Sequence, residues 1–350
     1  MGIKKIIAAV SVLALVFIFA ACTPDKNSVS SSSVLDNPDV LIETGEAMQI
    51  TEFTVVLTGY VNLPSELDEA EVGMIYDNKQ SFEEGKKVAV DRWLDGYVGF
   101  AAKVTGLLPG TSYYYKAYIQ YGKEVKYGEV SSFSTKESNC PAGAVDLGIV
   151  MTREDGTTYK LYWAKSNLCE EGLCPNPEDY GDYYSWGETE IKDDYGLWTY
   201  KWCNNSYSNL TKYNNSSSYG TVDNKTVLDP EDDVAHIILG GKWRIPTYAE
   251  WAELRKSCSW TGVFDQELGP SGVNGMLVKS INGNSIFLSD AGRRSGSGLQ
   301  EHAGLQGYYW TSTLNTAKPE RALYIDILFN SVAMKNDFRH LGFSVRPVSE

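Results

Sequence analysis

The chain has 350 residues, a formal net charge of −14 at pH 7, and an aromatic fraction of 12% that includes 23 Tyr and 9 Trp. This length accommodates two or three domains with separate cores, and the aromatic-rich composition favours folded β structure over disorder. The acidic balance excludes the basic footprint of a nucleic-acid-binding protein, so no nucleic-acid partner is expected.

Residues 1–21 have the pattern of an export signal. Lys4 and Lys5 precede an apolar run over residues 6–19, and Ala20-Ala21-Cys22 supplies a small-residue cleavage site. A cysteine at that point resembles the bacterial lipobox, which implies that Cys22 is lipidated and anchors the chain to a membrane. An ordinary signal peptide with a stray cysteine and an uncleaved anchor are the alternatives. We expect a lipoprotein at the outer membrane or cell surface of a Gram-negative bacterium, such as one of the Bacteroidota.

A change of composition separates a tether from a first domain. Residues 22–39 are rich in Ser, Asn and Asp and predict a flexible tether, because such a composition cannot bury a core. Residues 40–136 instead contain short strand-like runs at 54–61, 70–76 and 98–104, separated by Gly, Asn and Pro. That pattern predicts an antiparallel sandwich.

Residues 107–119 resemble the passage from strand E to strand F of fibronectin type III domains. Pro109-Gly110 would form the turn, and Tyr113 occupies the position of a tyrosine corner, whose hydroxyl bonds the backbone upstream. Strand alternation predicts a core face of Tyr115, Ala117 and Ile119 and an opposite face of Tyr114, Lys116 and Tyr118. A sugar-stacking platform is one interpretation of these tyrosines. A core with a solvated strand face is favoured, and the domain is interpreted as a spacer.

Residues 137–350 form the predicted second domain, organised around residues 240–254. Residues 243–245 predict a short buried strand, and Thr247 with Glu250 matches the capping box of a following helix. Trp251 and Leu254 lie on one apolar stripe of that helix. Earlier in the domain, Asp155-Gly156 predicts the turn of a hairpin between residues 150–151 and 159–163.

Two further segments of this domain have distinctive compositions. Residues 193–226, rich in Asn, Ser and Tyr, predict a long insertion with little regular structure, and such loops are usually functional or disordered. Residues 229–236 predict a short helix with an acidic first turn. Favourable interaction with the helix dipole explains these acids better than metal binding.

Five motifs carry a family resemblance over about residues 140–350. They are Tyr-Tyr-Ser-Trp-Gly-Glu-Thr at 183–189, Trp-Arg-Ile-Pro-Thr at 243–247, Asn-Gly-Asn-Ser-Ile-Phe-Leu at 282–288, Gly-Tyr-Tyr-Trp-Thr-Ser-Thr at 307–313 and the run at 339–348. Their order and spacing resemble the fibrobacter succinogenes major paralogous domain family. That family is related to the formylglycine-generating-enzyme type of C-type lectin fold. The resemblance implies a multidomain protein in which an all-β, fibronectin III-like sandwich precedes an α+β C-type-lectin-like domain.

We expect no enzyme, because this sequence departs from the catalytic pattern of its relatives. The formylglycine-generating relatives act through reactive cysteines late in the domain, whereas no cysteine here follows Cys258. The three histidines form no His-Glu-x-x-His motif, although a Ser-His-Asp triad stays open because its members need not be close in sequence. The calcium-lectin motifs Glu-Pro-Asn, Gln-Pro-Asp and Trp-Asn-Asp are missing from the sequence. We expect no metal and no cofactor, with calcium left open by the acidic loops.

Export permits disulfides, but five cysteines besides Cys22 leave at least one without a partner inside the chain. Cys169 and Cys174 are close enough to close a small loop. A pairing of Cys203 with Cys258 is a weaker hypothesis.

The remaining hypothesis is a recognition surface. By resemblance to relatives whose ligand residues are diversified near the carboxyl end, the polar-aromatic runs at 308–316 and 336–340 are the predicted site, with Trp310 assigned to the core. The predicted ligand-binding residues are Tyr308, Tyr309, Ser312, Asn315, Asn336, Asp337 and Arg339. We expect Asn315, Asn336, Asp337 and Arg339 to be the exposed members. The expected function is non-catalytic binding of a glycan or protein. A structural envelope or pilus-tip-like subunit and an unrecognised enzyme are the alternatives.

Overall fold

The computed structural model describes residues 33–67, 69–94, 99–264 and 273–350. The predicted signal peptide, Cys22 and most of the predicted tether lie outside these residues. The described part is a β-rich protein with separate hydrophobic cores in its two halves. Within that part, no helix combines the length and apolarity needed to cross a bilayer.

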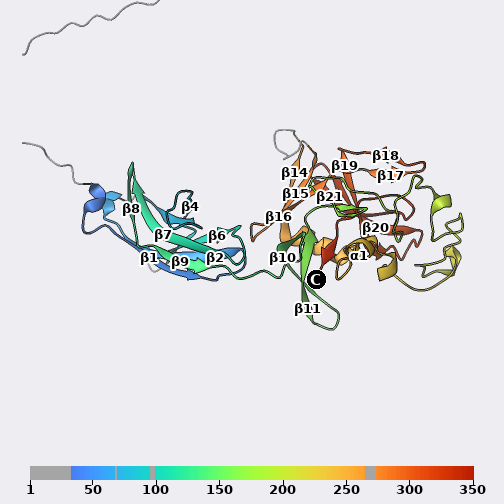
Figure 1. Cartoon of the computed structure of the whole chain (residues 1–350), viewed down its shortest axis with the longest axis horizontal. Helices are drawn as coiled ribbons and strands as arrows, with labels where there is room; N and C mark the ends of the chain where they lie inside the picture. The colour runs from blue at the N-terminus through green and yellow to red at the C-terminus, as the bar shows by residue number, and fades with distance from the viewer. Residues whose placement is uncertain (1–32, 68, 95–98, 265–272) are drawn as a thin grey trace, which may run out of the picture.

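The first half consists of two antiparallel sheets packed face to face (Figure 1). One has the order β1-β2-β6-β5, and the other has the order β4-β3-β7-β8 with β9 paired to β7. The strands of the first sheet are β1 Leu41–Met48, β2 Thr54–Asn62, β5 Arg92–Leu94 and β6 Gly99–Thr105. Those of the second are β3 Glu71–Asp77, β4 Lys86–Ala89, β7 Ser112–Tyr121, β8 Glu124–Tyr127 and β9 Ser131–Ser134.

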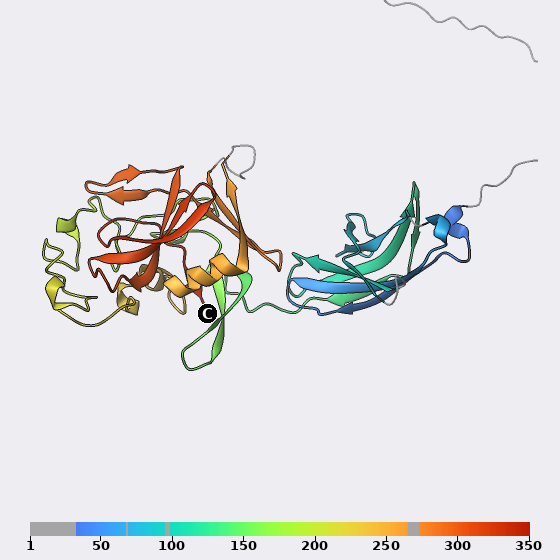
Figure 2. The same cartoon turned by 180° about the vertical axis from the view of Figure 1, so that it is seen from behind.

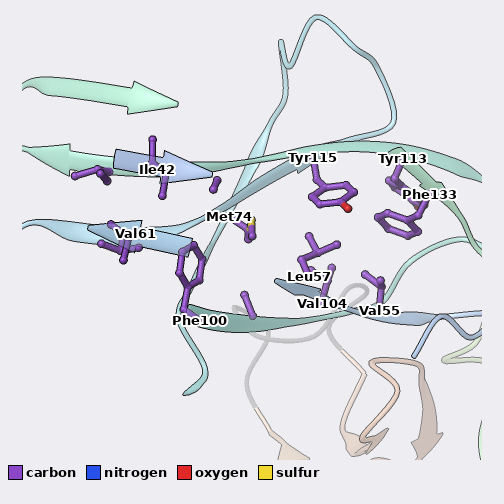
Figure 3. Close-up of a cluster of buried hydrophobic side chains, with 14 of the residues drawn as sticks. Ile42, Val55, Leu57, Val61, Met74, Phe100, Val104, Tyr113, Tyr115 and Phe133 are labelled. Carbon is purple, nitrogen blue, oxygen red and sulfur yellow. The ribbon is translucent and has the colours of Figure 1, made fainter. Parts of the chain in front are cut away.

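Side chains from both sheets fill the space between them (Figure 3). Leu57 of β2 and Met74 of β3 meet in this core, and Tyr113 and Tyr115 of β7 pack on Phe133 of β9. The Leu108 N–H donates to the Tyr113 hydroxyl at 2.9 Å, which confirms the predicted tyrosine corner.

In strand β7 the predicted core face is confirmed, but one residue of the predicted solvent-facing side is buried. Tyr115, Ala117 and Ile119 are buried, as predicted. Tyr118 was assigned to a solvated face but is fully buried. The Lys87 ammonium lies 4.4 Å from the centre of its ring, and its hydroxyl donates to Glu71, so neighbouring side chains cover this face.

The amino-terminal boundary of this half lies earlier than predicted. Val34–Asp36 form a short 3-10 helix, η1, and Leu35 packs into the core. The Lys126 ammonium donates to the carbonyls of Leu35 and Val40 at 3.1 and 2.7 Å. Residues 33–39 therefore belong to the folded unit. The prediction that the flexible tether extends to residue 39 is wrong for these seven residues.

Among its described residues, the second half contains three three-stranded sheets and two short hairpins. Figure 2 shows this half from behind. The sheet strands are β10 Ala144–Thr152, β11 Thr158–Ala164 and β22 Val348–Ser349; β14 Cys258–Val263, β15 Gly275–Ser280 and β16 Ser285–Ser289; and β19 Gln306–Leu314, β20 Arg321–Leu328 and β21 Ser331–Phe338. The hairpins are β12 Leu168–Cys169 with β13 Gly172–Leu173, and β17 Arg293–Ser295 with β18 Leu299–Glu301. The β10–β11 pairing confirms the predicted hairpin.

Helix α2, Tyr248–Ser257, begins at the predicted capping box. The Thr247 hydroxyl accepts from the Glu250 N–H, and the Glu250 carboxylate accepts from the Thr247 N–H. Trp251 packs edge-on against Trp163, with ring centres 4.6 Å apart. The predicted strand at 243–245 is wrong, because only Arg244 pairs there, in a single bridge to Val348.

The predicted helix at 229–236 is broken at Asp233. A 3-10 turn, η6 Pro230–Asp232, precedes helix α1, Val234–Leu239. The Asp233 carboxylate accepts from the N–H groups of Ala235 and His236, so this residue caps α1 and cannot continue a helix through itself.

Cys169 and Cys174 form the predicted disulfide. Cys203 and Cys258 are both free, so the hypothesis that they pair with each other is wrong.

The two halves meet at the turn between β15 and β16. The Gly106 N–H donates to the Asn282 carbonyl at 3.1 Å, and the Asn282 amide nitrogen donates to the Asp146 carbonyl at 2.9 Å. Beside this turn, the Lys160 ammonium pairs with Glu52 at 3.2 Å and with Asp146. These bonds hold one end of the first sheet against the second half.

The insertion at 193–226 has little regular structure, as predicted. Its helical elements are the 3-10 turns η4 Leu197–Thr199 and η5 Ser217–Tyr219. It also has a small core in which Tyr200, Cys203 and Leu210 are buried. Side-chain packing therefore holds the insertion where strand pairing does not.

Candidate functional site

Four of the seven predicted ligand-binding residues are buried. The exposed fractions of Tyr308, Tyr309, Ser312 and Arg339 are 4, 0, 3 and 1%. Tyr308 packs on Phe343 with ring centres 5.2 Å apart, and the Tyr309 hydroxyl donates to the Ser289 carbonyl at 2.7 Å. These four residues are therefore part of the protein interior. Trp310 is also buried, as predicted.

Arg339 was expected to be exposed, and this prediction is wrong. Its guanidinium donates to the Tyr200 hydroxyl at 2.8 Å and to the carbonyls of Lys212, Tyr213 and Pro319 at 3.0–3.1 Å. Three of these partners belong to the insertion. Arg339 therefore attaches the insertion to the segment that follows β21, and its donors are used within the protein.

The other three predicted residues lie at or near the surface. Asn315 lies in the turn between β19 and β20, where its side-chain amide oxygen accepts from the backbone N–H groups of Ala317 and Lys318. Asn336 is exposed on β21. Asp337, beside it, is half-buried and pairs with Arg293 at 3.2 Å.

Three aromatic side chains gather beside Asp337, and we call Tyr207, Phe338 and His340 the ring cluster. Tyr207 stacks on Phe338 with ring centres 4.5 Å apart, and its hydroxyl lies 3.3 Å from Nδ1 of His340. Tyr207 belongs to the insertion and was missed by the sequence analysis. The one feature of the sequence that could have indicated it is that Tyr207 is an aromatic residue within a run of Asn and Ser.

A row of charged side chains continues from the ring cluster. The Arg321 guanidinium lies 4.2 Å from the Phe338 ring centre and 4.0 Å from the Asp337 carboxylate. Arg293 bridges Asp337 and Glu301, at 3.2 and 2.8 Å. The side chains of these four charged residues are 21–27% exposed, so their hydrogen-bonding groups are partly accessible from solvent.

The side chains of the ring cluster are uncharged at pH 7. Burial, with a contribution from the Lys192 charge, lowers the pKa of His340 to about 4, so the imidazole is neutral at pH 7. Burial raises the pKa of Tyr207 to about 12, so its hydroxyl remains protonated. The surface thus offers neutral rings beside guanidinium donors and carboxylate acceptors.

The acidic cluster of Asp229, Glu231 and Asp232 surrounds a lysine. The Lys212 ammonium lies 2.6 Å from Asp229, 3.4 Å from Glu231 and 2.5 Å from Asp232. This arrangement neutralises part of the acidic charge and fastens the insertion to the start of α1. It agrees with a structural interpretation of these acids.

A second group of titratable residues lines a cavity of about 250 Å³ that includes Asp233, His236 and Arg244. Burial raises the pKa of Asp233 to about 6. Its carboxylate oxygens accept from the N–H groups of Ala235, His236 and Ile245. The carboxylate therefore serves to cap α1 and to fix the following loop.

Comparison with known proteins gives little further information. No family model matches the chain, and no curated protein matches it. Among solved structures, the sensor domain of the anti-sigma factor RsgI4 in Pseudobacteroides cellulosolvens is 19% identical, with a TM-score of 0.24, and the match covers 29% of this chain and 97% of that domain. A computer-redesigned β-sandwich protein is 20% identical, with a TM-score of 0.21, and covers 26% of this chain and 89% of its own length. Likenesses this weak carry no inference about function.

Proposed function

We propose that this protein is an exported, lipid-anchored surface protein whose carboxyl-terminal half, the head, binds a glycan or protein without catalysis. In this proposal, the first half is a fibronectin III-like sandwich and the head is C-type-lectin-like. The sheet orders and the tyrosine corner support the first assignment. The motifs that carry the family resemblance support the second.

Three of those motifs meet in one aromatic core. The Trp186 indole N–H donates to the Thr311 carbonyl at 2.7 Å, and the Trp310 indole N–H donates to the Tyr184 carbonyl at 2.8 Å. Phe343 stacks on Trp310 with ring centres 4.0 Å apart. Such a core gives a rigid base from which surface segments can vary, because every element of it is fixed by several contacts.

The observation that carries the proposal is the ring cluster with its adjacent charged row. Aromatic side chains contribute large contact areas at low entropic cost, and partly exposed guanidinium and carboxylate groups hydrogen-bond a polar ligand. The cluster is assembled from Tyr207 of the insertion, Phe338 at the end of β21 and His340 after it, and only Phe338 also packs against the core.

The test is binding of the exported chain to glycan arrays and its capture of proteins from cell surfaces, comparing the natural chain with Tyr207→Ala. Tyr60→Ala is the matched control, because Tyr60 is a half-exposed tyrosine of the first half. We expect Tyr207→Ala to weaken binding about tenfold or more and Tyr60→Ala to leave it unchanged. No binding in either assay would refute the proposal. Substrate turnover would favour the enzyme alternative, and stable assembly the envelope-subunit alternative.

A further inference from the structure

Trp198 is an exposed aromatic side chain outside the ring cluster. It lies in η4 of the insertion, and 66% of its surface is accessible to solvent. Tryptophan carries a large apolar area that is normally covered, and it is enriched where proteins bind partners. It belongs to none of the described hydrophobic cores.

Its indole is held in one orientation by its own loop. The Asp194 carboxylate accepts from the Gly196 N–H at 2.7 Å and from the Trp198 indole N–H at 2.9 Å. Gly196 has φ −81° and ψ 162°, which other residues adopt readily. However, a Cβ there would lie 2.6 Å from the indole ring, so glycine makes room for Trp198. An aromatic surface fixed in advance binds at a lower entropic cost.

A polar cavity of about 200 Å³ lies at the start of the same loop, and its lining reaches Tyr195, three residues before Trp198. Its lining includes Asp182, Ile191, Lys192, Asp193 and Arg294. At about 30 Å³ per water molecule, this volume corresponds to about seven waters, which is room for a single small ring. The cavity therefore suits one unit of a ligand at a time.

The lining combines hydrogen-bond donors and acceptors. Asp182 and Asp193 supply two carboxylates and Arg294 supplies a cation, whereas the Lys192 ammonium is paired with Glu188 and donates to the Thr199 carbonyl at 3.4 Å. Within the residues that the structure describes, the Asp193 carboxylate has no hydrogen-bond or ion-pair partner, and Arg294 uses one terminal nitrogen, Nη1, for the Gly298 carbonyl at 3.2 Å. Both acceptors and donors thus remain for hydroxyl groups, and two carboxylates beside one available cation favour a neutral ligand over an acidic one.

We propose that the loop from Ile191 to Trp198, with Arg294, is a carbohydrate subsite for a neutral pyranose. The apolar C–H face of one sugar ring stacks on Trp198. The hydroxyls of a neighbouring ring, seated in the cavity, bond Asp193 and Arg294. A single aromatic platform among polar groups fits a sugar better than a protein, whose stable interfaces bury about 800 Å² on each partner. The inference rests on the proposed function and narrows its ligand class.

The subsite also lies near the ring cluster. Arg294, which lines the cavity, and Gly342, two residues after His340, exchange backbone hydrogen bonds at 2.8 and 2.9 Å. An oligosaccharide of several rings therefore contacts both regions, and each makes a separable contribution to its affinity.

The experiment measures binding of the exported chain to an array of neutral, sialylated and sulfated oligosaccharides, followed by titration of the strongest neutral probe. We expect Trp198→Ala and Gly196→Ala each to weaken binding about tenfold or more, because the first removes the platform and the second displaces it. Asp193→Asn should weaken binding to a smaller extent, and Tyr60→Ala should not change it. Circular dichroism and thermal unfolding would verify that each variant is folded.

The outcomes separate this inference from the proposed function. Binding that is lost in Tyr207→Ala but unchanged in Trp198→Ala would overturn the subsite and leave the function standing. Binding to acidic oligosaccharides alone would overturn the neutral ligand class. No binding of the natural chain to any glycan, together with capture of a protein, would overturn the subsite while supporting protein recognition by the head.

Discussion

Replacing Arg339 by lysine tests whether this residue holds the insertion in place. A lysine ammonium cannot reproduce the planar set of donors with which Arg339 bonds Tyr200 and three carbonyl groups. Leaving buried acceptors without a donor costs about 1–3 kcal/mol each, and some of them will find water or rearrange. We therefore expect a local loss of about 3–5 kcal/mol.

The loss should be concentrated in residues 193–226, because three of the four partners lie there. Native-state hydrogen exchange and limited proteolysis should both report faster opening of this segment, and glycan binding should fall because Tyr207 and Trp198 depend on its placement. Opening of one segment with the remaining structure intact is a general property of proteins whose stability is not uniform.

Arg346→Lys is the matched control. Arg346 is also fully buried, and it donates to Asn167, to the Ala164 carbonyl at 3.2 Å and to the Phe287 carbonyl at 2.6 Å, none of which belongs to the insertion. This variant should lower the unfolding temperature without selective exposure of residues 193–226. Equal protection of the insertion in the natural chain and in Arg339→Lys would refute the reasoning.

Two further predictions concern the junction and a buried acid. A Cβ at Gly283 would lie 2.6 Å from the Gly106 nitrogen, so Gly283→Ala should loosen the two halves and broaden the distance distribution in small-angle X-ray scattering. Gly156→Ala, also at positive φ but with open space around it, should not; identical scattering from both variants would contradict this role of the turn. Burial raises the pKa of Asp290 from 3.8 to about 6, and its Oδ1 has no hydrogen-bond partner in the described structure. Because the folded-state pKa is the higher one, stability falls as the pH rises from about 4 through 6. Asp290→Asn should therefore raise the free energy of unfolding at pH 8, by at most about 3 kcal/mol, with little change at pH 4. An equal gain at both pH values in chemical denaturation would exclude ionisation as the cause.

The sequence by itself determined the features that depend on neighbouring residues. The capping box of α2, the Asp155-Gly156 hairpin, the tyrosine corner and the Cys169–Cys174 loop each involve groups a few positions apart. Their geometry follows from backbone conformation and side-chain reach, which the local sequence specifies. Strand alternation likewise identified the core face of β7.

Only the tertiary structure decided which polar and aromatic side chains reach solvent. Tyr118 and Arg339 were assigned to solvent-facing positions, yet Lys87 covers one and the insertion covers the other. Tyr207 and Phe338 are distant in sequence and meet only because Arg339 and the small core of the insertion place that loop beside β21. Burial depends on which segment lies over a strand face, and periodicity gives the direction of a side chain without revealing what covers it.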